Sequence, residues 1–371
     1  MKHPLTETKA QVRRVHRSAD ATEVTNYDYF SLNRFTERNF CTFGPALKSC
    51  PMNGLRTVLT FLLIGLTINL FSQQLSLFTQ YRENLTILNP AAVGSNYLTN
   101  EENLTFGATH RVQWQGIEGS PTTSTLRGDY LFDSGSSVSL LTGGYLINDQ
   151  TGPTGFTGLY GRVGGLLSDD PVYGGISLGL TFGLVQYRVN ASEIRLREQG
   201  DVLGVDDQTT IYPDVGVGLF AYTLLDGGFF DDDYLYGGIS VPQVFGLDLT
   251  FTGQNGEFFT QRVQHMYAMV GLYKFLRDES FLEPSLWVKY APNAPVNLDF
   301  NLRYQMAENF WIGLGGATSQ TMHLEAGVIL GNNLGLDNSL RIGYGYDYSF
   351  TDFGPYTGGA HELNISFSLE K

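Results

Sequence analysis

The chain has little with which to do thiol chemistry, and it carries little charge. Its only two cysteines, Cys41 and Cys50, lie within the first 51 of its 371 residues, so the remainder can form no disulfide framework. Charged residues make up only 16% of the sequence. After residue 72 there is no run of 18 or more apolar residues, so we expect no membrane-spanning helix.

The stretch MNGLRTVLTFLLIGLTINLFS, residues 52–72, has the parts of a secretory signal. Arg56 provides a positive start, Val58–Phe71 is uncharged and largely apolar, and Ser72 is a small residue of the kind that precedes cleavage. The apolar run is shorter than the roughly 20 residues that a membrane anchor needs. We therefore expect a signal peptide at 52–72 and export of the chain that follows.

A signal peptide acts near the N-terminus, yet 51 residues precede this one. Residues 1–51 hold eight Lys or Arg residues and show no apolar periodicity, unlike the rest of the chain. The simplest interpretation is a spurious or unstructured extension, with translation starting at Met52. An unusually extended signal is the alternative, and both predict a mature chain that begins near Gln73.

Acidic residues dominate the mature chain. Residues 1–72 hold nine of the 23 Lys and Arg residues and five of the 37 Asp and Glu residues, so residues 73–371 carry a formal net charge of −18. This balance argues against nucleic acid as a partner, because phosphates would be repelled. Gly (44), Phe (25) and Tyr (21) are abundant. This composition favours an outer-membrane β-barrel, with a soluble periplasmic β-protein as the alternative.

Strand periodicity favours the barrel. In VNLDFNLRYQM, residues 296–306, apolar and polar residues alternate without a break, so one strand face is apolar and the other polar. In a soluble sandwich the apolar face would line a core, whereas in a membrane barrel it faces lipid. Fourteen such segments, each near the ~10 residues that a tilted strand needs, are predicted. They lie near 101–112, 122–132, 137–147, 156–167, 173–188, 214–224, 234–242, 264–274, 282–291, 297–306, 309–317, 321–330, 339–349 and 361–369.

The connections between these segments support the count. The long ones, 113–121, 189–213, 243–263 and 350–360, are connections one, five, seven and thirteen, all odd. Outer-membrane barrels carry their longer loops outside, so the first strand would start at the periplasm. The predicted fold is an all-β, antiparallel transmembrane barrel over 101–371, preceded by a short periplasmic or plug segment over 73–100.

Three segments carry a resemblance to a known family: LFTQYRENLTILNPAAVGS (77–95), HRVQWQGIEGSPTT (110–123) and GYGYDYSFTDFGPYTGGAHELNISF (343–367). In order and spacing they resemble the PorP/SprF family of the type IX secretion system of Bacteroidetes, over essentially the whole mature chain. Ala360, where a serine is usual before His-Glu, and the ending Leu369-Glu370-Lys371 depart from the pattern. The family motifs are met by Gln73-Gln74, Thr79-Gln80-Tyr81, Leu88-Asn89-Pro90-Ala91 with Gly94, Arg111, Gln113, Trp114, Gly116, Gly119, Pro121, Thr122, Tyr344, Tyr346, Asp347, Gly359, His361 and Glu362.

The resemblance implies an outer-membrane component of type IX secretion that is not an enzyme and has no cofactor. It would support the secretion or surface attachment of cargo such as gliding adhesins. Implied partners are outer-membrane lipid, the ring or peptidoglycan-linked components, which residues 73–100 would meet at the periplasmic mouth, and cargo with a C-terminal sorting domain. Candidate partner-contact residues are Asn89, Pro90, Arg111, Gln113, Trp114, Pro121, Tyr346, Asp347, His361 and Glu362.

Physical chemistry gives several of these residues alternative roles. Asn89-Pro90 suits a rigid turn, either in a plug packed inside the barrel or in a docking element. If Arg111 and Gln113 point inwards, Arg111 needs an anionic partner. Trp114, at a strand end, suits either an aromatic girdle or a binding role. The candidate partners of Arg111 are Asp129, Asp299, Asp347 and Glu362.

Catalytic and metal sites find little support. His361 and Glu362 are adjacent in a predicted strand and point to opposite faces, with His361 outside and Glu362 in the lumen. The four histidines of the mature chain stand near no recognisable nucleophile motif. Asp206-Asp207 and Asp231–Asp233 lack the spacing of a calcium loop and are interpreted as solvated charge. The competing functions are a diffusion porin and a lipid-acting barrel enzyme.

Overall fold

A computed structural model describes most of the chain after the predicted signal, and these residues all fall within one compact unit, 69–371. The predicted extension at 1–51 and the signal peptide at 52–72 lie outside the described residues. In the described part, no helix is long and apolar enough to cross a membrane. The described residues are 78–190, 207–246, 248–253, 256–276, 280–307, 309–331, 335–336 and 338–370.

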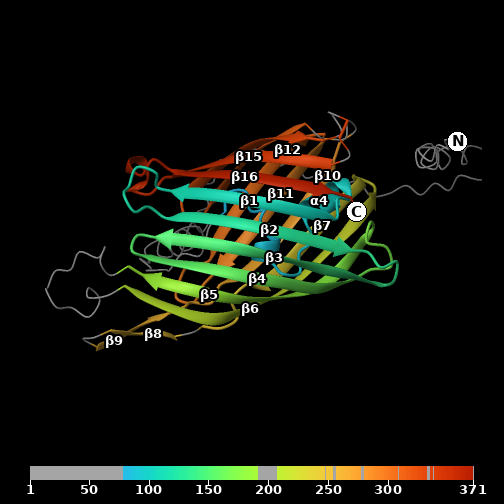
Figure 1. Cartoon of the computed structure of the whole chain (residues 1–371). Coiled ribbons are helices and arrows are strands. Elements are labelled where there is room, and N and C mark those ends of the chain that lie inside the picture. The colour runs from blue at the N-terminus through green and yellow to red at the C-terminus, as the bar shows by residue number, and fades with distance from the viewer. Residues whose placement is uncertain are drawn as a thin grey trace, which may run out of the picture. The chain divides into compact units, whose positions relative to one another are not determined.

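Fourteen antiparallel strands close into a barrel in chain order, with the last strand pairing with the first (Figure 1). This confirms the predicted fold and strand number, and each predicted range overlaps one barrel strand. The strands are β1 (Leu104–Gln113), β2 (Thr122–Phe132), β3 (Val138–Thr151), β4 (Thr154–Leu167), β5 (Gly174–Val189), β6 (Gln208–Gly227), β7 (Phe230–Val241), β10 (Met266–Phe275), β11 (Phe281–Tyr290), β12 (Asn297–Met306), β13 (Phe310–Ala317), β14 (Thr321–Leu330), β15 (Asn338–Ser349) and β16 (Ala360–Leu369).

One connection contains structure that the sequence did not reveal. Between β7 and β10, strands β8 (Asp248–Gly253) and β9 (Gly256–Gln261) pair with each other in a separate two-stranded sheet. Residues 243–263 were expected to be a plain loop. The hairpin lies beside the barrel wall near the end of the barrel that carries the longer loops (Figure 1).

The faces of the strands are those of a membrane barrel. On β12, Phe300 is 55% exposed on the outer face, whereas its neighbour Asp299 is 3% exposed and points into the lumen. The same order holds on β16, where Leu363 is exposed and Glu362 is buried. A soluble sandwich would bury the apolar residues instead, so the outward apolar face is the one that meets lipid.

The connections distinguish the two ends of the barrel. The long ones (114–121, 190–207, 242–265 and 350–359) share one end, which we call the loop end. The other, the turn end, carries shorter links and the last residues of β16. The predicted pattern of odd connections is therefore confirmed. Since outer-membrane barrels place long loops outside, we expect the loop end to face the cell exterior.

Two details of the connections differ from expectation. Strand β6 starts at Gln208 and runs to Gly227, so the link expected at 225–233 shrinks to residues 228–229. The aspartates at 231–233 consequently lie in β7 rather than in a loop. Asp233 is buried, and its carboxylate lies 2.7 Å from Lys274 Nζ, so it is a paired structural charge and not a solvated one.

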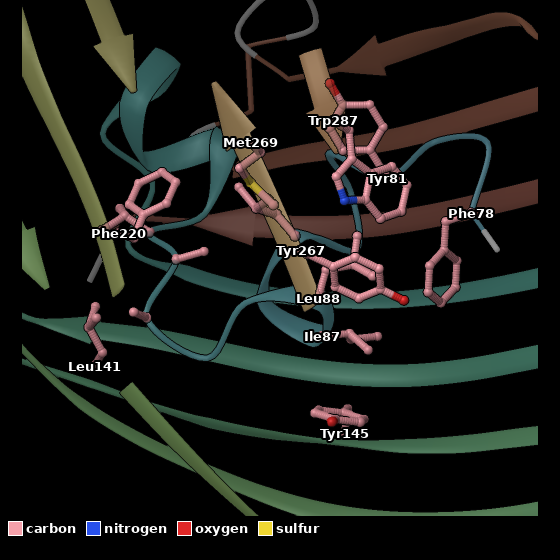
Figure 2. Packing of buried hydrophobic residues seen from close by; sticks show 14 of the residues in the cluster. Phe78, Tyr81, Ile87, Leu88, Leu141, Tyr145, Phe220, Tyr267, Met269 and Trp287 are labelled. Carbon is pink, nitrogen blue, oxygen red and sulfur yellow. The ribbon is translucent and has the colours of Figure 1, made fainter. Parts of the chain in front are cut away.

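The space inside the barrel is occupied by residues 78–103, which we call the lumen segment. It contains two short helices, α3 (Leu85–Leu88) and α4 (Ser95–Asn100), which the strand-dominated sequence did not predict. Its apolar side chains pack against aromatic residues of the wall (Figure 2). Tyr81 and Tyr267 both lie against Trp287, with ring centroids 5.0 and 5.4 Å apart. The hydrophobic core of this protein thus lies between the lumen segment and the barrel.

Candidate functional site: the filled lumen

The lumen segment runs along the barrel from the loop end towards the turn end. The contacts with strand β16 show this direction, because inward residues along the strand form hydrogen bonds with successive parts of the segment. Glu362, near the loop end, accepts hydrogen bonds from Thr79 and Gln80, while Ser368, near the turn end, accepts one from Asn96 (2.6 Å). Six residues of strand separate the two contacts, or about 20 Å. Residues 78–100 therefore fill the length of the lumen instead of lying at its periplasmic mouth.

A cluster of polar residues, which we call the latch, holds the start of the segment. The Glu362 carboxylate accepts the backbone N–H groups of Thr79 (2.7 Å) and Gln80 (2.9 Å). The Thr79 hydroxyl donates to Asp347 Oδ1 (2.8 Å). The Arg111 guanidinium lies 2.6 Å from the Asp347 carboxylate and 3.5 Å from that of Glu362. All five residues are buried, so each charge needs its partner.

The latch continues into a chain of paired charges along the wall. His323 Nδ1 lies 3.0 Å from the Asp347 carboxylate, and its Nε2 lies 3.2 Å from that of Asp299, which in turn pairs with Lys289 (2.8 Å). Of the four acids considered as partners of Arg111, Asp347 and Glu362 take that role. Asp129 instead lies 3.1 Å from both Arg127 and Arg162.

Replacing Glu362 with glutamine tests the latch. The amide oxygen can still accept one N–H, but the amide nitrogen would face the second N–H and Arg111, donor against donor. We expect E362Q to lower the free energy of unfolding in urea by about 1–3 kcal/mol, the usual cost of an unsatisfied buried group. E370Q, at an exposed position just after β16, is the matched control. Equal stability of the two variants would contradict this role of Glu362.

A second anchor lies further along the segment at Arg82. Its Nε lies 2.5 Å from Glu283 Oε2, one terminal nitrogen lies 3.1 Å from Glu325, and the other donates to Ser285 Oγ (2.9 Å). The Tyr81 hydroxyl also bonds to Ser285. A single guanidinium therefore pairs with two carboxylates that the barrel wall buries, and its planar fork suits several acceptors at once.

The Asn89-Pro90-Ala91 turn packs tightly on strands β4 to β7. Asn89 has no exposed surface, and its amide donates to the Leu219 carbonyl (3.1 Å). Arg162 donates to the Pro90 carbonyl (2.6 Å) and Ser177 to the Ala91 carbonyl (2.6 Å). These contacts place Asn89 and Pro90 in the packed segment and leave Asn89 no surface for docking.

Glycines of the wall make this approach possible. A Cβ atom at Gly218 would overlap Asn89 Oδ1, and one at Gly179 would overlap the Pro90 carbonyl. A Cβ atom at Gly238 would lie 2.7 Å from the Asn89 amide nitrogen. Adjacent strands thus contribute a patch without side chains that fits this turn, a reason for glycine on an inward strand face.

We expect Gly218→Val to dislodge the turn. Overpacking of this kind costs about 1–3 kcal/mol, and here the resident group is backbone and amide rather than a flexible side-chain tip. Local release would expose Arg82, which is otherwise buried, so trypsin should cleave after it faster. Gly161→Val on β4 is the control, because a Cβ there meets nothing within 4 Å. Equal cleavage rates in the two variants would show that Gly218 does not fit the turn.

The other candidate residues lie at the loop end of β1, β2, β15 and β16. The Gln113 N–H donates to the Pro121 carbonyl (2.8 Å), and the N–H of Trp114, just past β1, donates to the Gly359 carbonyl (2.7 Å). His361 points outwards, where the Tyr344 hydroxyl lies 2.5 Å from its Nδ1 and the Tyr346 ring lies beside it. The opposite faces predicted for His361 and Glu362 are therefore correct, and these two residues do not share a site.

Sequence reasoning missed several contributors to this site. Arg82, Glu283 and Glu325 belong to the second anchor, and Gly179, Gly218 and Gly238 accommodate the turn. The sequence has a polar or small residue at every second position of the strands. This alternation identifies the face that points into the lumen, but it does not indicate which residues pack against that face. Among the described residues, no group of three His, Cys, Asp or Glu side chains is placed to hold a metal ion.

Comparison with known proteins adds a family. A family model described as "Type IX secretion system membrane protein PorP/SprF" matches residues 70–367. No curated protein matches the chain.

Several solved barrels are similar in outline, at TM-scores too low to support an argument about function. The toluene transporter TbuX of Ralstonia pickettii has 9% identity and a TM-score of 0.45, over 77% of this chain and 93% of that one. The translocator domain of the autotransporter NalP from Neisseria meningitidis has 14% identity and a TM-score of 0.41, over 72% of this chain and 88% of that one. The transport unit of the autotransporter AIDA-I from Escherichia coli has 12% identity and a TM-score of 0.42, over 78% of this chain and 97% of that one.

Proposed function

Because this chain belongs to the PorP/SprF family of type IX secretion membrane proteins, we propose that it is an outer-membrane component of that export system. It supports the secretion or surface attachment of exported proteins such as gliding adhesins. Its partners are the exported cargo, through a C-terminal sorting domain, and the ring or peptidoglycan-linked components of the machinery. We further propose that it has no catalytic activity of its own.

The observation that carries this proposal is how the lumen is filled. The three motif segments converge in the latch: Thr79 and Gln80 come from the first, Arg111 from the second, and Asp347 and Glu362 from the third. The residues by which the chain resembles the family therefore hold a segment inside the barrel. They do not line an open passage.

The alternative of a diffusion porin receives no support from this arrangement. Two spaces between the lumen segment and the wall have volumes of about 30 and 40 Å³. Each has room for roughly two or three water molecules, whereas sites for small organic molecules measure about 300–1,000 Å³. In the described part of the chain, neither of these two spaces has room for a solute, and this supports a structural or partner-binding role over diffusive transport.

The test combines purification with gene removal. The tagged protein is purified from outer membranes of its host, and its co-purifying proteins are identified by mass spectrometry. In parallel, the proteins at the cell surface and in the medium are compared with and without the gene. We expect ring components or one large surface protein with the bait, and selective loss of exported proteins without the gene. A bait free of partners, together with unchanged export, would overturn the proposal.

A further inference from the structure

Four neighbouring connections at the loop end form one continuous rim, which we define as residues 114–121, 152–153, 318–320 and 350–359. Backbone hydrogen bonds join each connection to the next, so the shape of the rim does not depend on side-chain contacts alone. Loops tied in this way present a fixed surface. The bonds, donor first, are Phe350 to Gln320 (2.7 Å), Trp114 to Gly359 (2.7 Å), Gly116 to Thr357 (3.1 Å) and Gly152 to Gly119 (3.0 Å).

The rim carries large aromatic side chains that nothing in the described chain covers. Phe350, Phe353 and Tyr356 are 61%, 74% and 81% exposed, and Ile117 of the neighbouring loop is also exposed. A 3₁₀ turn at Gly354–Tyr356, with a proline at its start, fixes the direction of the last of them. These residues lie in connections, beyond the ends of the strands. An apolar patch in this position marks an interaction surface.

Charge at the rim restricts the kind of partner. The four connections contain two charged residues, Glu118 and Asp352, both exposed, and no Lys or Arg. The phosphates of lipopolysaccharide would be repelled by these carboxylates. A protein surface with an apolar centre and surrounding Lys or Arg residues would match both features, because aromatic anchors with a complementary polar border are typical of protein interfaces.

We propose that this aromatic rim is the surface on which the exported protein docks, through an apolar patch bordered by basic residues. The inference rests on the proposed function, since it names where the cargo of that function binds. In the described part of the chain, the lumen segment occupies the space beneath the rim, so the partner rests on the rim itself.

Site-specific photo-cross-linking in the native host tests the location. A benzoylphenylalanine residue replaces Phe353, and the matched control replaces Tyr173, an aromatic residue 62% exposed in a connection at the turn end. We expect an adduct of protein size at position 353 that a protease added to intact cells degrades. It should disappear when type IX export is blocked, and position 173 should not give it. An adduct with lipopolysaccharide, an adduct with a second copy of this chain, or no adduct at position 353 would overturn the proposal.

Affinity then tests the chemistry of the contact. The protein identified in the adduct is purified and titrated against the whole barrel in detergent, with F353A/Y356A and Y173A as the compared variants. Loss of two central aromatic anchors should weaken binding roughly thirty-fold or more, whereas Y173A should bind as wild type. Raising the ionic strength should also weaken the binding of the wild-type protein, because salt screens the attraction between Glu118 and Asp352 and the basic groups of the partner. Equal affinity of F353A/Y356A and wild type would overturn the proposal.

The proposed function and the proposed docking surface can be overturned independently of each other. If removal of the gene leaves every exported protein in place, the proposed function is wrong. If removal matters but F353A/Y356A retains exported proteins at the cell surface as wild type does, only the docking surface is wrong.

Discussion

Replacing Arg82 with methionine is expected to lower the free energy of unfolding by about 3–5 kcal/mol, the cost of breaking a buried ion pair from one side. Methionine retains most of the side-chain volume but leaves Glu283, which has no exposed surface, and Glu325 without their cation. The Tyr236 hydroxyl, 2.6 Å from Glu283, compensates only part of that charge. Urea unfolding in lipid vesicles, followed by tryptophan fluorescence, measures the loss, because Trp287 packs against Tyr81 next to this anchor.

Two further variants separate charge from geometry at the same place. R82K keeps the positive charge but has one nitrogen in place of three, so we expect it to recover only part of the stability. R82M/E283Q removes one of the two stranded carboxylates and should be more stable than R82M alone, as coupled sites are non-additive. If R82M unfolds as wild type does, Arg82 does not anchor the lumen segment.

Sequence periodicity was sufficient for the barrel because the information it uses is local. The alternation around Phe300 fixes which side chains share a face, and the same rule placed His361 and Glu362 on opposite sides. Membrane insertion then requires the apolar face to point outwards, and closure follows because open sheet edges are excluded from lipid. Each step concerns one strand or one general constraint, so no knowledge of long-range contacts was needed.

The elements that escaped prediction depend on contacts distant in sequence. Helices α3 and α4 have four and six residues, too short to be stable alone, and exist because the wall packs around them. The hairpin of β8 and β9 lies outside the barrel, so the spacing rule for spanning strands does not apply to it. Asp233 looked solvated because its partner Lys274 is 41 residues away and meets it only through strand pairing.

The sequence predicted only part of the candidate site, because the pairing of its residues also depends on contacts distant in sequence. Arg111 could be said to need an acid, but the choice among four acids depended on strand register, which places Glu362 directly opposite it. Gly218 could be assigned to an inward face, but nothing in its own strand indicates that Asn89 packs on it. Both cases show that a lumen-facing residue can be recognised locally, whereas its partner is decided by the closed barrel.

Excising residues 78–100 is expected to convert a non-conducting barrel into an ion-conducting one. The intact protein should give no steady conductance in planar bilayers, since the lumen segment fills the space between the strands. Without it, Arg111, Asp347 and Glu362 would face an empty lumen that water must enter to hydrate them. A fourteen-stranded barrel is wider than the eight-stranded barrels that side chains alone can fill, so a water-filled path should remain.

The control for this experiment removes a segment of the chain that lies outside the lumen. Excision of residues 248–261 takes away the β8–β9 hairpin, which pairs only with itself and contributes no strand to the barrel. We expect that variant to remain non-conducting. If both deletions conduct, or if the intact protein conducts as well as the chain lacking 78–100, the lumen segment does not close the barrel and diffusive transport becomes the better account. If only the deletion of 78–100 conducts, the function of this barrel depends on what it binds and not on what it lets through.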